Sequence, residues 1–200
     1  ADKARRKEIQ KRVVDRYRIE KSEIQKHKSA LELFKKMPVP AQQKRERDAE
    51  NISAEALTFF KNNNYEQSVN LFKKAANTDP SNLSYYFQHA ISLYKDKQYN
   101  EALIAFGITK DVAAFKKESR YYQGICHYEL KEYELGLQVF EEIAATKDEK
   151  YAGLAVFYKG LIFFDQKEYE KAKLEFSNVL DISNDPKLDE RAEKYMENID

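Results

Sequence analysis

Three histidines and one cysteine are the side chains with the most direct capacity for metal binding or nucleophilic chemistry. His27, His89 and His127 share no metal-ligand spacing. Cys126 is the only cysteine, so no disulfide can form within the chain, and its place in a helical pattern favours a buried thiol over a nucleophile. No glycine-rich phosphate loop or nucleophile elbow is present. The sequence therefore predicts a protein that is not an enzyme and needs no metal or cofactor.

Basic side chains are concentrated near the N-terminus. Residues 1–48 contain sixteen Lys and Arg against eight Asp and Glu, a balance of +8, so the rest of the chain, which totals +1, carries −7. Such a split is typical of an arm that meets nucleic acid, an acidic membrane or an acidic protein, and equally of a solvated helix or one that folds back on its own acidic body. Tyr17 is the one interior aromatic of this arm, a poor platform for stacking bases. Nucleic acid is therefore the weakest of these partner predictions.

The composition indicates an all-helical protein. Aromatic residues make up 13% of the chain, whereas five glycines and four prolines are few for a protein built on tight turns. The longest mostly apolar stretch, YAGLAVFYKGLIFF, is interrupted by Lys159 and is too short to span a bilayer. The chain begins at Ala1 rather than Met, so a removed leader stays possible and the localisation is left open between cytoplasm and bacterial periplasm.

A pattern of twelve residues occurs four times in the chain. KNNNYEQSVNLF begins at Lys61 and returns as KDKQYNEALIAF, ELKEYELGLQVF and DQKEYEKAKLEF. The tyrosines of the four copies, which are 34, 34 and 36 residues apart, are Tyr65, Tyr99, Tyr133 and Tyr169. A fixed period of this length is the signature of a helical solenoid, in which each unit buries its apolar face only against its neighbours.

Small residues and phenylalanines keep fixed distances from these tyrosines. Three places after each tyrosine stand Ser68, Ala102, Gly136 and Ala172, and four places further stand Phe72, Phe106, Phe140 and Phe176. Nine places before each tyrosine stand Ala56, Ala90, Gly124 and Gly160. Because three- and four-residue steps share one helical face, each unit is predicted to be two antiparallel helices, A and B, that meet through small residues and are braced by aromatics.

This pattern resembles the tetratricopeptide repeat, whose features include a glycine or alanine in helix A, a tyrosine opening helix B, an alanine, an aromatic and a closing proline. The closing proline is present as Pro80 and, displaced, as Pro186, and the second and third units lack it. The resemblance covers about residues 49–186 and implies an all-α, right-handed solenoid of four helix pairs. It supports the fold more strongly than any particular function.

The segments outside the repeats complete the predicted organisation. The stretch MPVPA at 37–41 stops one helix and permits another to start. Leu188 and Ala192 recur at helical spacing among charges, as in a capping helix. We therefore predict a basic N-terminal helix over 1–36, a linker and start of the first repeat helix over 37–48, repeats over about 49–82, 83–116, 117–150 and 153–186, and a capping helix over 187–200.

A stripe of apolar residues on the A helices is the predicted binding groove, because helix A lines the concave side of such repeats. Its members are Phe60, Phe87, Ile91, Tyr94, Tyr121, Ile125, Tyr128, Phe157, Leu161 and Phe164. Some are expected to pack between repeats, but one ring per repeat (Phe60, Tyr94, Tyr128 and Phe164) makes a ladder suited to a partner helix or extended peptide. The places that form a carboxylate clamp in some relatives of this fold contain no cation. They are Ser53, Leu57, Gln88, Glu118 and Tyr122.

The N-terminal segment is predicted to be one long helix with a thin apolar seam. The seam residues are Val13, Tyr17, Ile24, Leu31 and Phe34, which follow heptad spacing. Glu20 and His27 interrupt the seam, so its coiled-coil character is weak. Such a helix needs a partner, which could be its own groove, a second copy of the chain or another protein.

The sequence as a whole predicts a non-catalytic scaffold that binds an apolar or amphipathic peptide or helix of a protein partner in the aromatic groove. The alternative is a structural protein in which residues 1–36 self-associate, a layout similar to that of a bacterial envelope protein linked to the Tol system. Binding of nucleic acid or another acidic surface through the basic helix is the third possibility.

Overall fold

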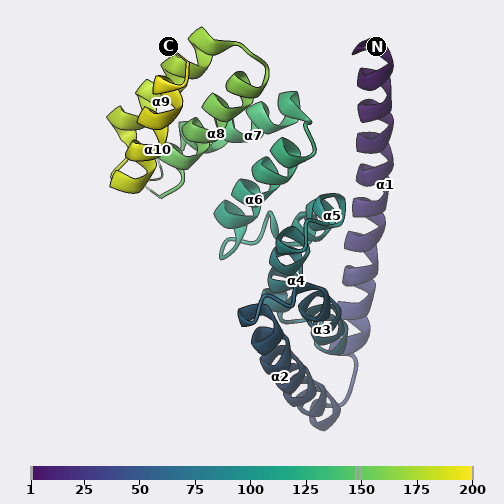
Figure 1. Ribbon diagram of the computed structural model, residues 1–200. Coiled ribbons are helices and arrows are strands. Elements are labelled where there is room, and N and C mark those ends of the chain that lie inside the picture. Colours follow the sequence, from purple (N-terminus) through teal and green to yellow (C-terminus); the bar gives the residue numbers. More distant parts are fainter. Residues whose placement is uncertain (1, 147, 149, 200) are drawn as a thin grey trace. The chain divides into compact units, whose positions relative to one another are not determined.

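The computed structural model describes residues 2–146, 148 and 150–199, and every regular element in these ranges is an α-helix (Figure 1). The helices are α1 (Asp2–Lys35), α2 (Val39–Lys61), α3 (Tyr65–Thr78), α4 (Leu83–Lys95), α5 (Tyr99–Thr109), α6 (Lys116–Glu129), α7 (Tyr133–Ala145), α8 (Ala152–Asp165), α9 (Tyr169–Ile182) and α10 (Pro186–Glu197). The all-α prediction is confirmed. Each repeated tyrosine begins a B helix: α3, α5, α7 or α9.

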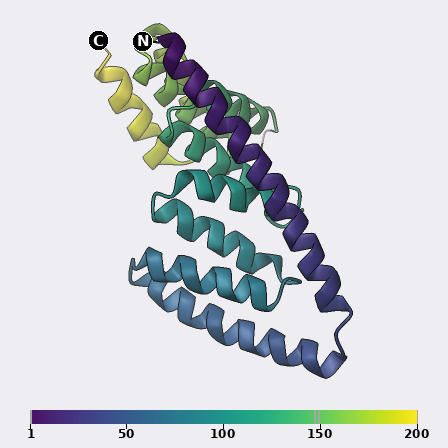
Figure 2. The same ribbon diagram turned by 90° about the vertical axis from the view of Figure 1, so that its right-hand side faces the viewer.

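The chain forms two compact units, Ala1–Ser119 and Arg120–Asp200, and the division falls inside α6. In the first unit α2, α3, α4 and α5 pack each against the next, and Figure 2 shows these four helices as successive layers. In the second unit α7 packs on α8, α8 on α9, and α9 on α10. Within α2–α5 and α7–α10, helices that follow one another in sequence are thus neighbours in space, as the repeat pattern predicts.

The predicted contact between small residues and phenylalanines is present inside the repeats. Phe140 and Phe176 are completely buried. A Cβ atom added to Gly124 would lie 2.6 Å from the Phe140 ring, and one added to Gly160 would lie 2.6 Å from the Phe176 ring. Because that distance is far below van der Waals contact, helices A and B can approach this closely only where helix A has no side chain.

The four turns from helix A to helix B share one backbone conformation. Each has a non-glycine residue with positive φ two places before the tyrosine, namely Asn63, Lys97, Lys131 and Lys167, with φ between 57° and 62°. In the second repeat the Lys97 amide donates to the Tyr94 carbonyl and the Gln98 amide to the Leu93 carbonyl, and the other three turns repeat these bonds. The turn therefore satisfies the free carbonyl groups at the end of helix A, as in a Schellman motif.

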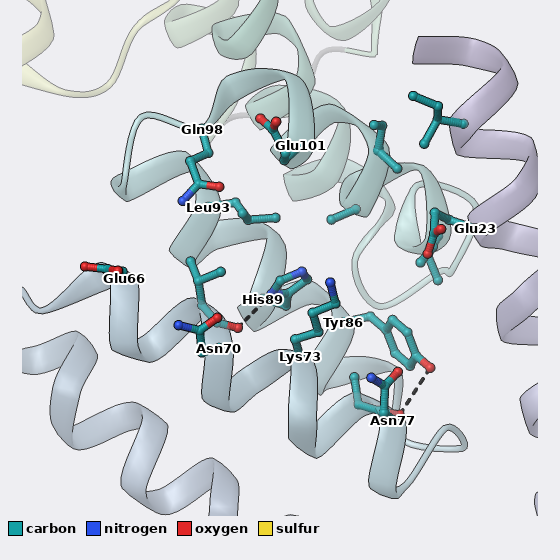
Figure 3. A pocket seen from close by; sticks show the side chains of 16 residues that line it. Glu23, Glu66, Asn70, Lys73, Asn77, Tyr86, His89, Leu93, Gln98 and Glu101 are labelled. Atoms are coloured by element: carbon teal, nitrogen blue, oxygen red, sulfur yellow. Dashed lines mark hydrogen bonds between the residues drawn. The ribbon is translucent and has the colours of Figure 1, made fainter. Parts of the chain in front are cut away.

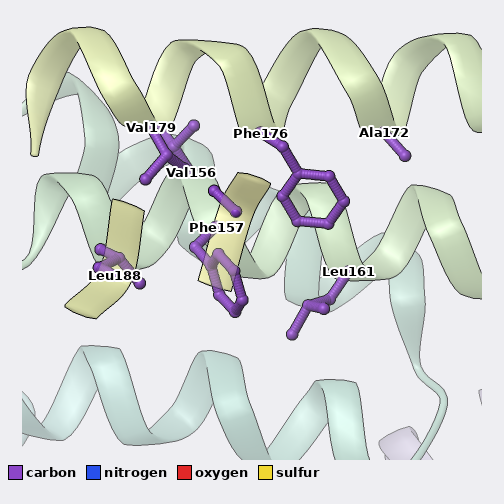
Figure 4. Close-up of a cluster of buried hydrophobic side chains, with 8 residues drawn as sticks. Val156, Phe157, Leu161, Ala172, Phe176, Val179 and Leu188 are labelled. Atoms are coloured by element: carbon purple, nitrogen blue, oxygen red, sulfur yellow. The ribbon is translucent and has the colours of Figure 1, made fainter. Parts of the chain in front are cut away.

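The core of the second unit is closed by α10 (Figure 4). The buried cluster comprises Val156, Phe157 and Leu161 of α8, Ala172, Phe176 and Val179 of α9, and Leu188 and Ala192 of α10. The first turn of α10 is capped by Asp185, whose side chain accepts a hydrogen bond from the Lys187 amide. The last helix thus covers the apolar face that α8 and α9 would otherwise expose.

Candidate binding surfaces

The ring that ends each A helix contacts the tyrosine that opens the following B helix. The centroid distances are 5.3 Å for Phe60–Tyr65, 6.1 Å for Tyr94–Tyr99, 6.3 Å for Tyr128–Tyr133 and 5.7 Å for Phe164–Tyr169. These separations and the tilted or edge-on ring planes are those of favourable aromatic pairs. The four A-helix rings remain half-buried, so each repeat presents part of one aromatic ring at the turn between its helices.

Five other members of the predicted groove are buried. Phe87 and Ile91 lie in the core of the first unit, and Ile125, Phe157 and Leu161 lie in that of the second. Phe157 has no exposed surface and Ile125 has 2%. We therefore assign these five residues to packing between helices and leave them out of the proposed binding surface. The reason is that their ridge of the A helix meets the next helix of the same unit instead of solvent.

Tyr158, which the sequence analysis did not select, brings two predicted residues together in the second unit. Its ring contacts Tyr121 at 6.1 Å and Tyr128 at 5.6 Å, both edge-on, and stacks on Phe140 at 5.1 Å. Tyr122 occupies the same place in the preceding repeat, and this shared aromatic character is the sequence signal that could have found Tyr158.

The hydroxyl groups of Tyr128 and Tyr158 remain protonated. Burial raises the pKa of Tyr128 above its ordinary value of 10.0, and the charge of Asp165 raises it further. Burial likewise raises the pKa of Tyr158. The cluster therefore offers apolar ring faces together with neutral hydroxyl groups, a combination enriched at protein interfaces.

The N-terminal helix packs against its own repeats through α5. Lys110 Nζ lies 2.7 Å from Glu20 Oε1, and the Arg16 guanidinium donates to the Asn100 side chain at 3.0 Å. A Cβ atom added to Gly107 would lie 2.6 Å from Glu20, so this glycine gives α1 the space to approach α5. The partner that the long helix requires is therefore, in this structure, the B-helix side of the first unit.

The apolar seam of α1 is divided between this interface and solvent. Phe34 is buried, while Val13, Ile24 and Leu31 are half-buried and Tyr17 is 55% exposed. The residues that interrupt the heptad pattern face the repeats. Glu20 pairs with Lys110 as described, and the His27 ring meets Tyr86 edge-on at 4.7 Å. Both residues are polar, which weakened the coiled-coil prediction. Their contacts with the repeats explain why polar side chains stand at these places.

A pocket of about 510 Å³ lies between α3, α4 and α5 and is bounded on one side by α1 (Figure 3). Its apolar lining includes Val69, Leu93 and Ala105, and its polar lining includes Lys73 and His89. The sequence analysis did not foresee this pocket. The lining residues come from four helices, and no pattern within a single helix predicts the pocket.

Within 2–146, 148 and 150–199, no group of three or more His, Cys, Asp or Glu side chains is arranged to hold a metal ion. Over the same part of the chain, no helix combines the length and the apolar character that crossing a bilayer requires.

Comparisons with known proteins found one family model and several solved structures. The model, described as anaphase-promoting complex, cyclosome, subunit 3, matches residues 23–109. No curated protein sequence matches the chain. A structure described as MamA RS-1 ArsTM double mutant has a TM-score of 0.59 at 17% identity, covering 76% of this chain and 92% of the MamA chain. MamA 41-end from Desulfovibrio magneticus RS-1 has a TM-score of 0.58 at 18% identity, with coverages of 78% and 93%. At these identities the likeness concerns the fold.

Proposed function

We propose that the chain is a non-catalytic scaffold that binds a protein partner. The partner's apolar or amphipathic segment lies on the aromatic rings of the A helices. The chain is a tetratricopeptide-repeat protein by its repeats and its fold. The proposal rests on one observation. The terminal ring of the A helix is partly exposed in all four repeats and is held against the next helix by a second ring.

Rings held in this way suit protein recognition for two reasons. Their contacts with the opening tyrosines restrict their rotation before a partner arrives, so less conformational entropy is lost on binding. Aromatic side chains are also enriched among residues that dominate interface energies. In the first unit the proposed surface consists of Phe60 and Tyr94. In the second unit it consists of Tyr121, Tyr128 and Phe164.

Substitution of one ring in each unit tests this function. A peptide selected on the full chain from a library of amphipathic sequences would be titrated against the double variant Tyr94→Ala, Tyr128→Ala. Removing two anchors is expected to weaken binding by at least tenfold per anchor, since such residues contribute about 1.4 kcal/mol or more each. The circular dichroism spectrum should be unchanged, because both rings are partly exposed.

A matched control removes a tyrosine outside the proposed surface. Tyr17→Ala deletes a ring of similar size from α1, and the peptide affinity should stay within twofold of the original. Unchanged affinity in the double variant would contradict the proposed surface. If Tyr17→Ala lowers the peptide affinity instead, the peptide binds on α1.

A second candidate function is self-association through α1. Val14, Tyr17 and Leu33 are more than half exposed, so α1 keeps apolar side chains that its contacts with the repeats do not cover. Light scattering on the full chain and on a Val14→Lys, Tyr17→Lys variant would test this function. An oligomer that becomes a monomer supports it, and two equal monomer masses exclude it.

A further inference from the structure

The lining of the pocket beside α1 includes a smaller side chain than the other repeats have at the matching place. Six residues after the opening tyrosine, the second repeat has Ala105, whereas the other repeats have Leu71, Val139 and Glu175. Ala105 lines the pocket. Its volume of about 510 Å³ is within the range of sites that hold small molecules or a partner's side chains. The small side chain at this place is thus specific to the second repeat.

His89 supplies a defined hydrogen-bond acceptor in this pocket. Its Nδ1 atom lies 3.1 Å from the Val69 carbonyl oxygen. A carbonyl oxygen can only accept, so Nδ1 must carry the proton of this bond. Burial, which outweighs the opposing effect of the hydrogen bond to Val69, and the charge of Lys73 together lower the pKa of His89 to about 4. The ring is therefore neutral near pH 7, and Nε2 keeps a lone pair that suits a ligand with an N–H or O–H group.

The charged side chains around the pocket favour a cation. Three carboxylates line it, those of Glu23, Glu66 and Glu101, against one ammonium group, that of Lys73, which leaves a formal charge of −2. Glu23 also pairs with Lys26, one turn away on α1, with Nζ and Oε1 2.6 Å apart. Figure 3 shows Glu66 and Glu23 on opposite sides of the pocket, with Glu101 between them at the upper edge of the view. A positive group can therefore meet carboxylates on either side of the apolar lining.

We propose that this pocket binds an aliphatic ammonium group, carried either by a free alkylamine or by a lysine side chain of a peptide. The hydrocarbon part contacts Val69, Leu93 and Ala105, and the ammonium group lies toward the carboxylates, with its N–H groups able to reach His89. The site lies among α1, α3, α4 and α5 and shares no residue with the rings proposed above. Either proposal can therefore fail without the other.

Occupation of this pocket should also strengthen the docking of α1. Ile19 and Glu23 of α1 form one wall, so a ligand contacts α1 and the repeats together. A ligand that binds only when α1 is docked adds its binding free energy to the docked state. Amide hydrogen exchange in α1 should therefore slow when a ligand binds.

A pair of probes with opposite charge tests the proposal on the full-length protein. The amide resonances of Ala105 and His89 would be followed during titration with n-hexylamine and, separately, with hexanoate. The amine should give saturable shifts, and its affinity should rise about fourfold per CH₂ across butyl-, hexyl- and octylamine. Equal or tighter binding of hexanoate would overturn the assigned charge. Absence of saturable shifts with both probes would overturn the site.

Substitutions taken from the other repeats provide matched controls. Ala105→Leu introduces the residue of the first repeat into the apolar lining. It narrows the pocket and should weaken amine binding while the helical spectrum is retained. Glu66→Gln with Glu101→Gln alters only exposed side chains, so folding should persist, and amine affinity should fall at least threefold. Undiminished amine binding in both variants would refute the proposal.

The two sources of the ammonium group are separated by one further titration. An acetylated, amidated peptide with a single lysine is compared with the same peptide carrying norleucine in its place. Tighter binding of the lysine peptide than of n-hexylamine assigns the site to a peptide partner, and the reverse order assigns it to a free amine. Equal binding of the lysine and norleucine peptides counts against recognition of the ammonium group.

Discussion

The two terminal helices pack on the repeats of their own units by different chemistry. The α10 helix contributes Leu188 and Ala192 to the buried core of the second unit, and Tyr195 stacks on Phe176 at 5.2 Å. The α1 helix has one buried ring, Phe34, its other apolar seam residues are half-buried or exposed, and Glu20 forms an ion pair with Lys110. One end of the chain is thus closed by complete apolar burial, and the other is held by partial burial and polar contacts.

This difference predicts unequal stability at the two ends. Burial of an apolar side chain contributes about 1.5–3 kcal/mol. A partly buried ion pair contributes little net free energy, because desolvation offsets most of the Coulomb attraction. We therefore expect α10 to exchange its amides only when the second unit unfolds and α1 to detach at lower free energy.

The largest expected effect is that of Leu188→Ala. This side chain is 3% exposed, and its truncation should lower the unfolding free energy of the second unit by about 2–5 kcal/mol because it leaves a cavity under α10. Urea denaturation of the full chain, with hydrogen exchange to assign the unit, measures this change. The control is Leu174→Ala on α9, where the side chain is 62% exposed and the change should stay within about 0.5 kcal/mol. Similar losses in both variants would mean that α10 does not close this core.

Acid should destabilise the first unit next most strongly. Burial lowers the pKa of His89 from 6.5 to about 4 and also lowers that of His27. The unfolded chain therefore binds protons that the folded chain does not, and stability is lost as the pH falls from about 6.5 to about 4. For His89 alone the loss is about 3 kcal/mol. Thermal unfolding between pH 7 and pH 4 measures it, and an equally steep pH dependence in His89→Gln would exclude this origin.

The ion pair of α1 should have a smaller effect. Glu20→Gln removes the charge that faces Lys110, and amide exchange in α1 should become about fivefold faster, corresponding to about 1 kcal/mol. Glu32→Gln is the matched control, because Glu32 pairs with exposed Lys35 in its own helix. If both variants exchange alike, the contact with α5 does not hold α1.

Contacts that repeat along the chain could be predicted from the sequence, whereas contacts that occur once could not. The contact of Gly160 with Phe176 repeats with the period of the chain, so its pattern is visible without a structure. The pair of Glu20 and Lys110 joins residues 90 positions apart and has no counterpart in another repeat, so no periodicity shows it. The pocket at Ala105 is defined by missing side-chain atoms, which hydrophobic patterns do not register.

The half-buried rings show that helical spacing alone does not predict how exposed a side chain is. Helical spacing places Phe157 and Phe164 in one stripe, yet Phe157 is completely buried whereas Phe164 is only half-buried. Tyr195 of α10 contacts both rings, at 5.9 Å from Phe157 and 5.3 Å from Phe164. Only Phe157 is enclosed completely, in the cluster that α8, α9 and α10 form together. Periodicity identifies a face of a helix, and tertiary packing decides which part of that face stays accessible.

The smallest expected change in unfolding free energy comes from the positive-φ residues of the turns. It should differ between the units because the residue type at this place differs. Lys131 in the second unit has φ of 57°, a conformation that is strained for a residue with a Cβ atom, whereas Asn63 in the first unit has φ of 60° and tolerates it better. Lys131→Gly should therefore stabilise the second unit by about 0.5–1 kcal/mol, because the relief of strain exceeds the added entropy of the unfolded chain. Asn63→Gly should change the first unit by less than about 0.3 kcal/mol, because Asn visits this region readily. Chemical denaturation of both variants measures the difference, and an equal gain in both units would show that side-chain type does not set the strain of this turn.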